Sequence, residues 1–194
     1  MLKKSFIVIS VLLLLAQFNS VEAISRQQYA HKLASQAEMM SKQKGKNFLA
    51  ISYINEAIKL QPSNLGMYYK RVSVYGRAGL YAEAIKDLNL ILKNDPLRKK
   101  FPSSLKYRAE CFAALGAYQQ ALSDYSTFLR QAPKSGKLWY YYAELLWFVG
   151  NRDKALAAIS QGLQTGSHWV GKMRFLQKQI FENKKVVLHK PFSN

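Results

Sequence analysis

The sequence predicts an all-α protein, an α-solenoid of about four helix–turn–helix units followed by a closing helix. The prediction depends on three residue types that recur together at a period near 34 residues, and on apolar residues that follow helical spacing within each period. The coincident positions are Gly45, Gly79, Gly116 and Gly150, then Ala50, Ala84, Ala121 and Ala155, and then Pro62, Pro96 and Pro133. The second glycine interval is longer than the others, since residues 97–101 extend one loop.

An export signal is expected ahead of the repeats. Residues 1–4 include two lysines, residues 6–18 are almost all apolar, and residues 21–23 end in a small side chain. This order is typical of a secretory signal peptide, here residues 1–23 with cleavage after Ala23. A retained membrane anchor is the alternative, although a spanning helix needs about 20 apolar residues.

The predicted segments follow from the repeat period. Glycine permits the positive φ that ends a helix, and proline cannot continue one, so these residues separate helices and units. The segments are a lead at 24–30, units at 31–64, 65–98, 102–135 and 136–169, a closing helix at 170–185 and a mobile basic tail at 186–194.

The third unit carries the clearest motif. It reads Leu105-x2-Arg108-Ala109-x2-Phe112, Leu115-Gly116-x-Tyr118, Ala121-x3-Tyr125 and Pro133. Over residues 31–167 the chain therefore resembles the tetratricopeptide repeat (TPR) family, and the first unit departs from the pattern at Glu38, where a small residue belongs. The resemblance implies a right-handed α-solenoid in which each unit buries its apolar face against its neighbours.

Large side chains at helical spacing are expected in the core. They are Tyr68, Tyr75, Phe112, Tyr125, Trp139 and Leu146. Cys111 is expected to be buried as a small apolar residue, with pairing between molecules as the alternative. A single cysteine excludes a disulfide framework and a cysteine-based zinc site.

No pattern of catalytic residues is apparent. The three histidines, His31, His168 and His189, have no metal-ligand spacing to another histidine, a cysteine or a carboxylate. Neither a phosphate-binding glycine loop nor a nucleophile elbow occurs. The sequence therefore predicts a protein that is not an enzyme, with no catalytic residue, no metal and no cofactor.

The resemblance implies a ligand groove on the concave face, lined by the first helix of each unit. The positions of that face are Lys32, Met39, Tyr69, Lys70, Ser73, Arg77, Lys106, Tyr107, Glu110, Lys137, Tyr140, Tyr141, Glu144 and Trp147. Tyrosines outside the core are candidate anchors, because they offer a large contact area and a polar end. For Trp147 the alternative is packing against Leu176 and Phe181 of the closing helix.

Two functions follow as hypotheses. The first is an exported scaffold, periplasmic or secreted, that binds an acidic protein or peptide segment in this groove and serves assembly of a cell-envelope complex. The alternative depends on the formal net charge of +18 and on basic clusters at residues 42–46 and 98–100. It is a binder of an anionic polymer or membrane surface, such as acidic glycan, lipid head groups or nucleic acid. The oligomeric state is left open.

Overall fold

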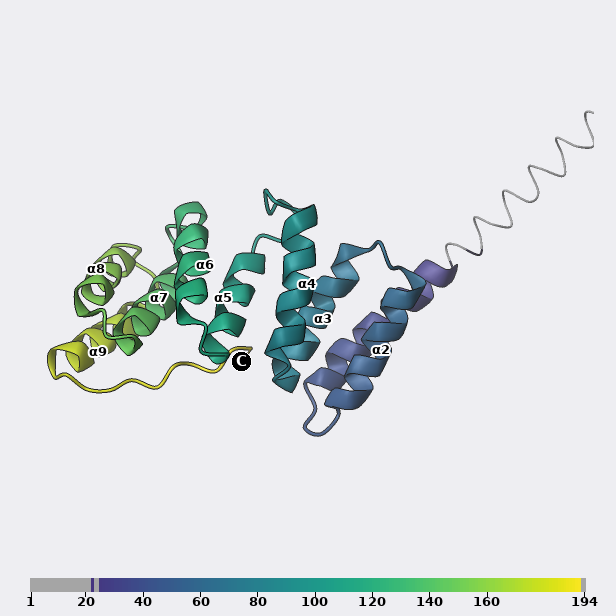
Figure 1. The fold of residues 1–194 in the computed structure, drawn as a ribbon, viewed down its shortest axis with the longest axis horizontal. Helices are drawn as coiled ribbons and strands as arrows, with labels where there is room; N and C mark the ends of the chain where they lie inside the picture. The colour runs from purple at the N-terminus through teal and green to yellow at the C-terminus, as the bar shows by residue number, and fades with distance from the viewer. Residues whose placement is uncertain (1–21, 23–24, 193–194) are drawn as a thin grey trace, which may run out of the picture. The chain divides into compact units, whose positions relative to one another are not determined.

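A computed structural model describes residue 22 and residues 25–192 of the chain, and Figure 1 shows their helices. Residues 25–41 are helical. The helices after them are α2 (Asn47–Leu60), α3 (Leu65–Ala78), α4 (Tyr81–Asn94), α5 (Ser104–Ala114), α6 (Tyr118–Gln131), α7 (Gly136–Phe148), α8 (Arg152–Leu163) and α9 (Val170–Phe181). No strand occurs among the described residues, so the all-α prediction is confirmed.

The repeated glycines and alanines take the roles that the sequence predicts. The glycines that end the first helix of each pair have φ between 77° and 83°, a region that other residues rarely adopt. The four repeated alanines, Ala50, Ala84, Ala121 and Ala155, are fully buried. A methyl side chain at these places lets the paired helices approach closely.

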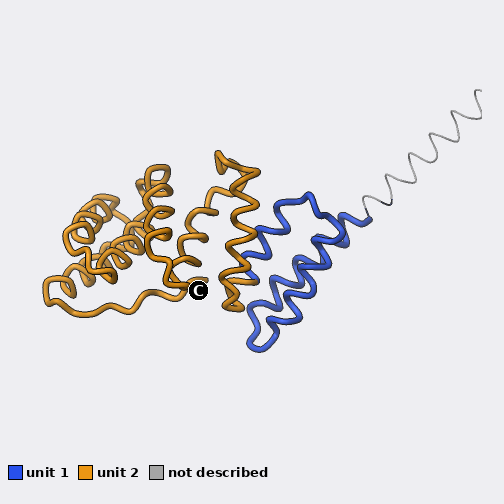
Figure 2. The backbone as a smooth tube through the Cα atoms, viewed as in Figure 1, with its two compact units in different colours: residues 1–74 blue, residues 75–194 orange. Residues whose placement is uncertain are grey.

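The described residues form two compact units, one that ends at residue 74 and one that begins at residue 75 (Figure 2). In the first unit, Leu33 and Ala37 of the helix at 25–41 pack against Ile54 of α2 and Met67 of α3. Residues 25–30, expected as a separate lead, belong to that same helix. The predicted signal peptide lies outside the described residues except for Glu22, and no helix that is described is long and apolar enough to cross a bilayer.

The second unit contains two packed clusters. Tyr125, Leu129 and Leu145 lie at the centre of one. In the other, Met173 and Ile180 of α9 cover α7 and α8. The helix predicted at 170–185 ends at Phe181, and the residues beyond it leave the helical path.

Some aromatic side chains predicted in the core are only partly buried. Tyr125 is fully buried, whereas Tyr68 and Trp139 are half-buried. The Tyr68 hydroxyl donates to the Pro62 carbonyl at 2.9 Å, and the Trp139 indole donates to the Pro133 carbonyl at 2.8 Å. Each ring therefore ties the start of a unit to the end of the preceding one.

The extended loop after α4 is organised by one carboxylate. Asp95 accepts hydrogen bonds from the backbone N–H groups of Lys99, Lys100 and Phe101 at 2.9–3.1 Å. These bonds outweigh the effect of desolvation and hold the pKa of Asp95 below its ordinary value. The inserted residues thus form an ordered turn before α5 begins.

Candidate functional site

The predicted groove residues are divided between the two units. In the first unit, Lys32 and Met39 are exposed, and Lys70 pairs with Glu38 at 3.2 Å. In the second unit, α5 and α7 present most of the predicted residues. We call this surface the α5–α7 face, and its members are Lys106, Tyr107, Glu110, Lys137, Tyr140, Tyr141 and Glu144.

The C-terminal tail runs back across this face. After α9, residues 183–192 have no helix or strand, and Figure 1 shows them passing from α9 toward α5. The mobility that the sequence predicts for the tail at 186–194 stays a prediction. In the described part of the tail, Val186 and Leu188 pack at alternate positions against the apolar clusters of the second unit.

His189 lies at the middle of these contacts. Its ring stacks on Tyr141, with centroids 3.5 Å apart and planes inclined by 8°. Its Nδ1 lies 2.7 Å from Oε2 of Glu144, and its backbone N–H donates to the same oxygen at 3.2 Å. The Tyr140 hydroxyl donates to the other carboxylate oxygen at 3.0 Å. Both carboxylate oxygens of the buried Glu144 therefore have hydrogen-bond partners, and Glu144 holds both the ring and the main chain of His189 in place.

Phe192 makes a second group of contacts at the other end of the face. Its ring stacks on Tyr107 with centroids 5.5 Å apart, and its backbone N–H donates to the Glu110 carboxylate. The ring also occupies the space over Gly76, where an added Cβ would lie 2.3 Å from a ring carbon. Glycine at this point of α3 permits that close approach.

The interior of the face is acidic. Glu110 and Glu144 are both about 5% exposed. Burial raises the pKa of Glu110, although Lys106, His189 and Lys137 oppose the shift. Burial, together with the charges of Glu110 and Glu144, raises the pKa of Tyr141 to about 12. A histidine or another hydrogen-bond donor suits this environment better than a carboxylate does.

Trp147 faces the closing helix and the tail. It packs in the cluster that contains Leu176, and its indole N–H donates to the Lys184 carbonyl at 2.9 Å. Trp147 thus packs against α9, as the alternative prediction has it, and does not line an open groove. A cleft beside it is lined by Phe148, Lys185 and Val186 among others.

Three residues of the site were not predicted. Trp169 contacts Tyr140 and Tyr141, with centroids 5.4 and 5.7 Å away, while His189 and Phe192 come from the tail. The tail did carry a signal, because apolar residues alternate at 186 and 188 and Pro191 favours extended backbone. No group of three or more potential metal ligands occurs within the described ranges.

Comparisons with known proteins agree with the fold. No protein-family model matches the chain. A tetratricopeptide repeat protein from Parabacteroides merdae superposes with a TM-score of 0.66 at 20% identity, over 80% of this chain and 61% of its own. A thermophilic TPR protein from Thermus thermophilus gives 0.57 at 20% identity, over 81% and 82%. The protein therefore has the TPR fold.

A curated relative matches part of the sequence. Human serine/threonine-protein phosphatase 5 is 34% identical over 93 residues, which are 47% of this chain and 18% of the phosphatase. The rat protein of that name matches to the same extent. The chain thus corresponds to less than a fifth of the length of these relatives, and the match gives no ground for assigning phosphatase activity to it.

Proposed function

We propose that this protein is an exported, non-enzymatic scaffold whose α5–α7 face binds an extended segment of another protein during assembly of a cell-envelope complex. The proposal has three parts, which are the bound ligand, the compartment and the absence of catalysis. The TPR fold supports the first part in general terms. The geometry of the tail supports it in detail.

The observation that carries the proposal is that the face already holds an extended segment. Residues 184–192 lie on it through backbone as well as side-chain contacts, since a backbone carbonyl of the tail accepts from Trp147 and backbone N–H groups donate to Glu110 and Glu144. Backbone contacts of this kind are available to any extended chain. A segment of another protein can use the same donors and acceptors.

The chemistry of the face favours a ligand other than the acidic segment expected from net charge. Two buried carboxylates lie beneath the tail, and Lys106 approaches only one of them, at 3.8 Å from Glu110. An acidic ligand residue would have to lie beside the buried Glu144 carboxylate, at a large electrostatic cost. We therefore propose a ligand with a donor side chain at this point.

Affinity capture from an envelope extract tests the scaffold function. The wild-type protein is compared with a Tyr107→Ala/Tyr141→Ala variant, and Tyr29→Ala serves as the control because Tyr29 is 54% exposed on the first helix, in the other unit. The account predicts one protein that wild type and control retain at high salt and the double variant loses. Equal capture by the double variant would contradict the proposal.

Export is supported by the sequence of residues 1–23, with its basic start, apolar stretch and small residue at 23. N-terminal sequencing of the protein from fractionated cells tests it. A mature chain that begins at Ile24 in the periplasm or medium is the expected result. An intact Met1 on membrane-bound protein would favour the retained anchor.

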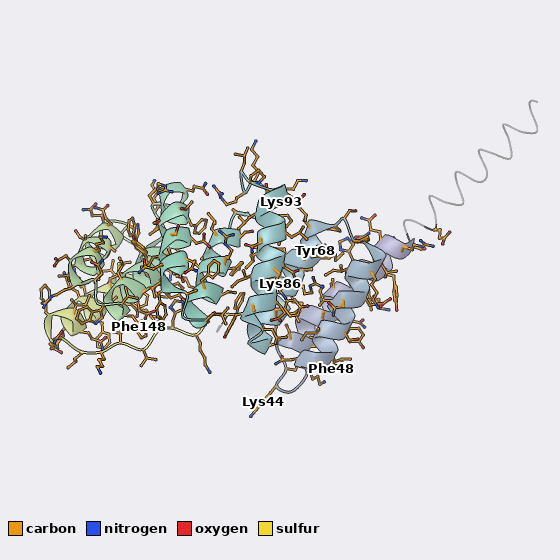
Figure 3. The ribbon with its side chains drawn as sticks, viewed as in Figure 1. Lys44, Phe48, Tyr68, Lys86, Lys93 and Phe148 are labelled. Atoms are coloured by element: carbon orange, nitrogen blue, oxygen red, sulfur yellow. The ribbon has the colours of Figure 1, made fainter. Side chains whose placement is uncertain are left out.

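A second candidate function is docking on an anionic membrane surface. Lys42, Lys44 and Lys46 are exposed in the loop before α2, and Phe48 beside them is 85% exposed (Figure 3). An exposed aromatic ring next to lysines is suited to the interface of an anionic bilayer, where each lysine near the surface contributes about 1 kcal/mol.

Vesicle co-sedimentation tests this candidate. Binding to phosphatidylglycerol vesicles, absent with phosphatidylcholine and lost at high salt, is the expected result, and Phe48→Ser should weaken it. Leu115→Ser is the matched control, because Leu115 is 51% exposed and residues 109–121 around it contain no lysine or arginine. Equal effects of the two substitutions would exclude a specific role for the loop.

A further inference from the structure

The tail fits the α5–α7 face at three points that follow one another along the chain. Leu188 packs into the cluster around Tyr125, and His189 stacks on Tyr141. Phe192, three residues further on, stacks on Tyr107. Val187, between the apolar contacts, is 92% exposed. The points of contact therefore have a fixed spacing, as the side chains of a recognised peptide do.

The contact of His189 with Tyr141 and Glu144 selects the ligand side chain by its chemistry as well as by its shape. The imidazole lies flat on Tyr141, and its Nδ1 and backbone N–H both approach one oxygen of Glu144. The Lys137 Nζ lies 5.5 Å from the centroid of the Tyr141 ring. A flat ring that donates a hydrogen bond satisfies these neighbours. An aliphatic side chain would leave the Glu144 oxygen with one donor fewer.

The tail also leaves part of the site unsatisfied. The Nε2 atom of His189 and the hydroxyl of Tyr125 are buried, and neither has a hydrogen-bond partner among the described residues. Both residues line a cavity of about 30 Å³ that Glu110 and Leu145 also line. A ligand residue that carries a further polar group at this point can pair with both atoms.

We infer that the α5–α7 face selects an extended segment in which a hydrogen-bond-donating ring follows an apolar residue and precedes an aromatic residue by three positions, and that residues 186–192 are this chain's own copy of that ligand. The inference rests on the proposed function and specifies its ligand. The tail competes as a tethered segment, at an effective concentration that short linkers bring to about the millimolar range. An external ligand must displace it.

A peptide titration tests the inference. The probe is a fluorescein-labelled peptide with the sequence of residues 184–192, followed by fluorescence anisotropy. The proteins are full-length wild type, a His189→Ala/Phe192→Ala variant that weakens the tail, and a Val187→Ser control that changes an exposed tail residue. A fourth protein adds Tyr141→Ala to the weakened tail. Far-UV circular dichroism and melting curves establish that all four are folded.

The expected result is binding to the weakened-tail variant about tenfold tighter than to wild type or to Val187→Ser, because apparent affinity rises with the fraction of open sites. Adding Tyr141→Ala should reduce the affinity by about tenfold, and a peptide with alanine at both ring positions should bind no variant. Equal affinity for wild type and the weakened-tail variant would overturn the inference.

The failure of the inference can be distinguished from failure of the proposed function. In one outcome, the folded weakened-tail variant does not bind the labelled peptide but binds other peptides of an array, and Tyr141→Ala abolishes that binding. The proposed ligand class is then wrong, and the scaffold function stands. If the variant binds no peptide of the array, both are overturned.

Discussion

The imidazole of His189 and the phenol of Tyr141 stack at 3.5 Å between centroids, and Glu144 binds the imidazole edge. This contact joins the end of the chain to α7. The sequence predicts that the α5–α7 face is open, whereas in the structure the tail covers it. The consequences of that occupation can be measured on the protein itself.

Gly76→Ala should release the end of the tail without unfolding α3. The new Cβ would lie 2.3 Å from the Phe192 ring, so the ring must leave. Alanine is favoured over glycine in a helix by about 1 kcal/mol, so the melting temperature should not fall. Hydrogen exchange at the Phe192 amide should accelerate. Gly171→Ala is the control, since a Cβ there meets nothing within 4 Å, and equal protection in both variants would contradict the placement of Phe192.

Glu110→Gln should stabilise the protein more at pH 7 than at pH 4. Burial raises the pKa of Glu110 above its ordinary value of 4.5. The folded state therefore holds the proton more tightly than the unfolded state, and the wild type loses this stability as pH rises through the raised pKa. Urea unfolding at both pH values checks the prediction. A variant whose free energy of unfolding differs from wild type equally at pH 4 and pH 7 would show that Glu110 is not desolvated.

The Cys111 thiol should be unreactive in the native protein. It is fully buried, as predicted from the sequence, and burial followed by the charge of Glu110 raises its pKa to about 12. An aromatic disulfide reagent at pH 8 should label it only after unfolding in urea. Stoichiometric labelling of the folded protein, or a disulfide-linked dimer, would refute this prediction.

Arg108→Ala should destabilise the second unit by about 2–3 kcal/mol. Arg108 forms a two-bond pair with Asp124 at 2.7 and 2.8 Å and donates to Asn89 at 2.7 Å, so its removal leaves a nearly buried carboxylate without its cation. Lys59→Ala removes an exposed pair with Glu56 and should cost about 0.5 kcal/mol or less. Chemical unfolding compares the two, and similar losses would be inconsistent with this role for Arg108.

The fold could be predicted because its determinants are local and repeated. A glycine with positive φ and a buried alanine recur in every unit, and each acts on residues close to it in sequence. The hydrogen bonds of Tyr68 to Pro62 and of Trp139 to Pro133 also lie within six residues. Because such contacts recur in each unit, the repeat in the sequence indicates them directly.

The candidate site could be predicted only in part, because a segment distant in sequence contributes residues to it. Tyr107 and Tyr141 occupy the helix positions from which they were chosen, but their partners Phe192 and His189 follow no repeat. The prediction of an acidic ligand depended on the net charge, which is a sum over the whole chain. It could not anticipate that Glu110 and Glu144 lie buried beneath an otherwise basic surface.

Photo-crosslinking in the cell tests the central claim most directly. A benzoylphenylalanine in place of Tyr107 puts the crosslinker where Phe192 now stacks, and the same residue in place of the exposed Phe175 on α9 is the control. The account predicts a crosslink from position 107 to an extended segment of a second protein, with an aromatic residue at the attachment point. Crosslinks from position 107 only to the chain's own tail, while position 175 captures the partner, would contradict it.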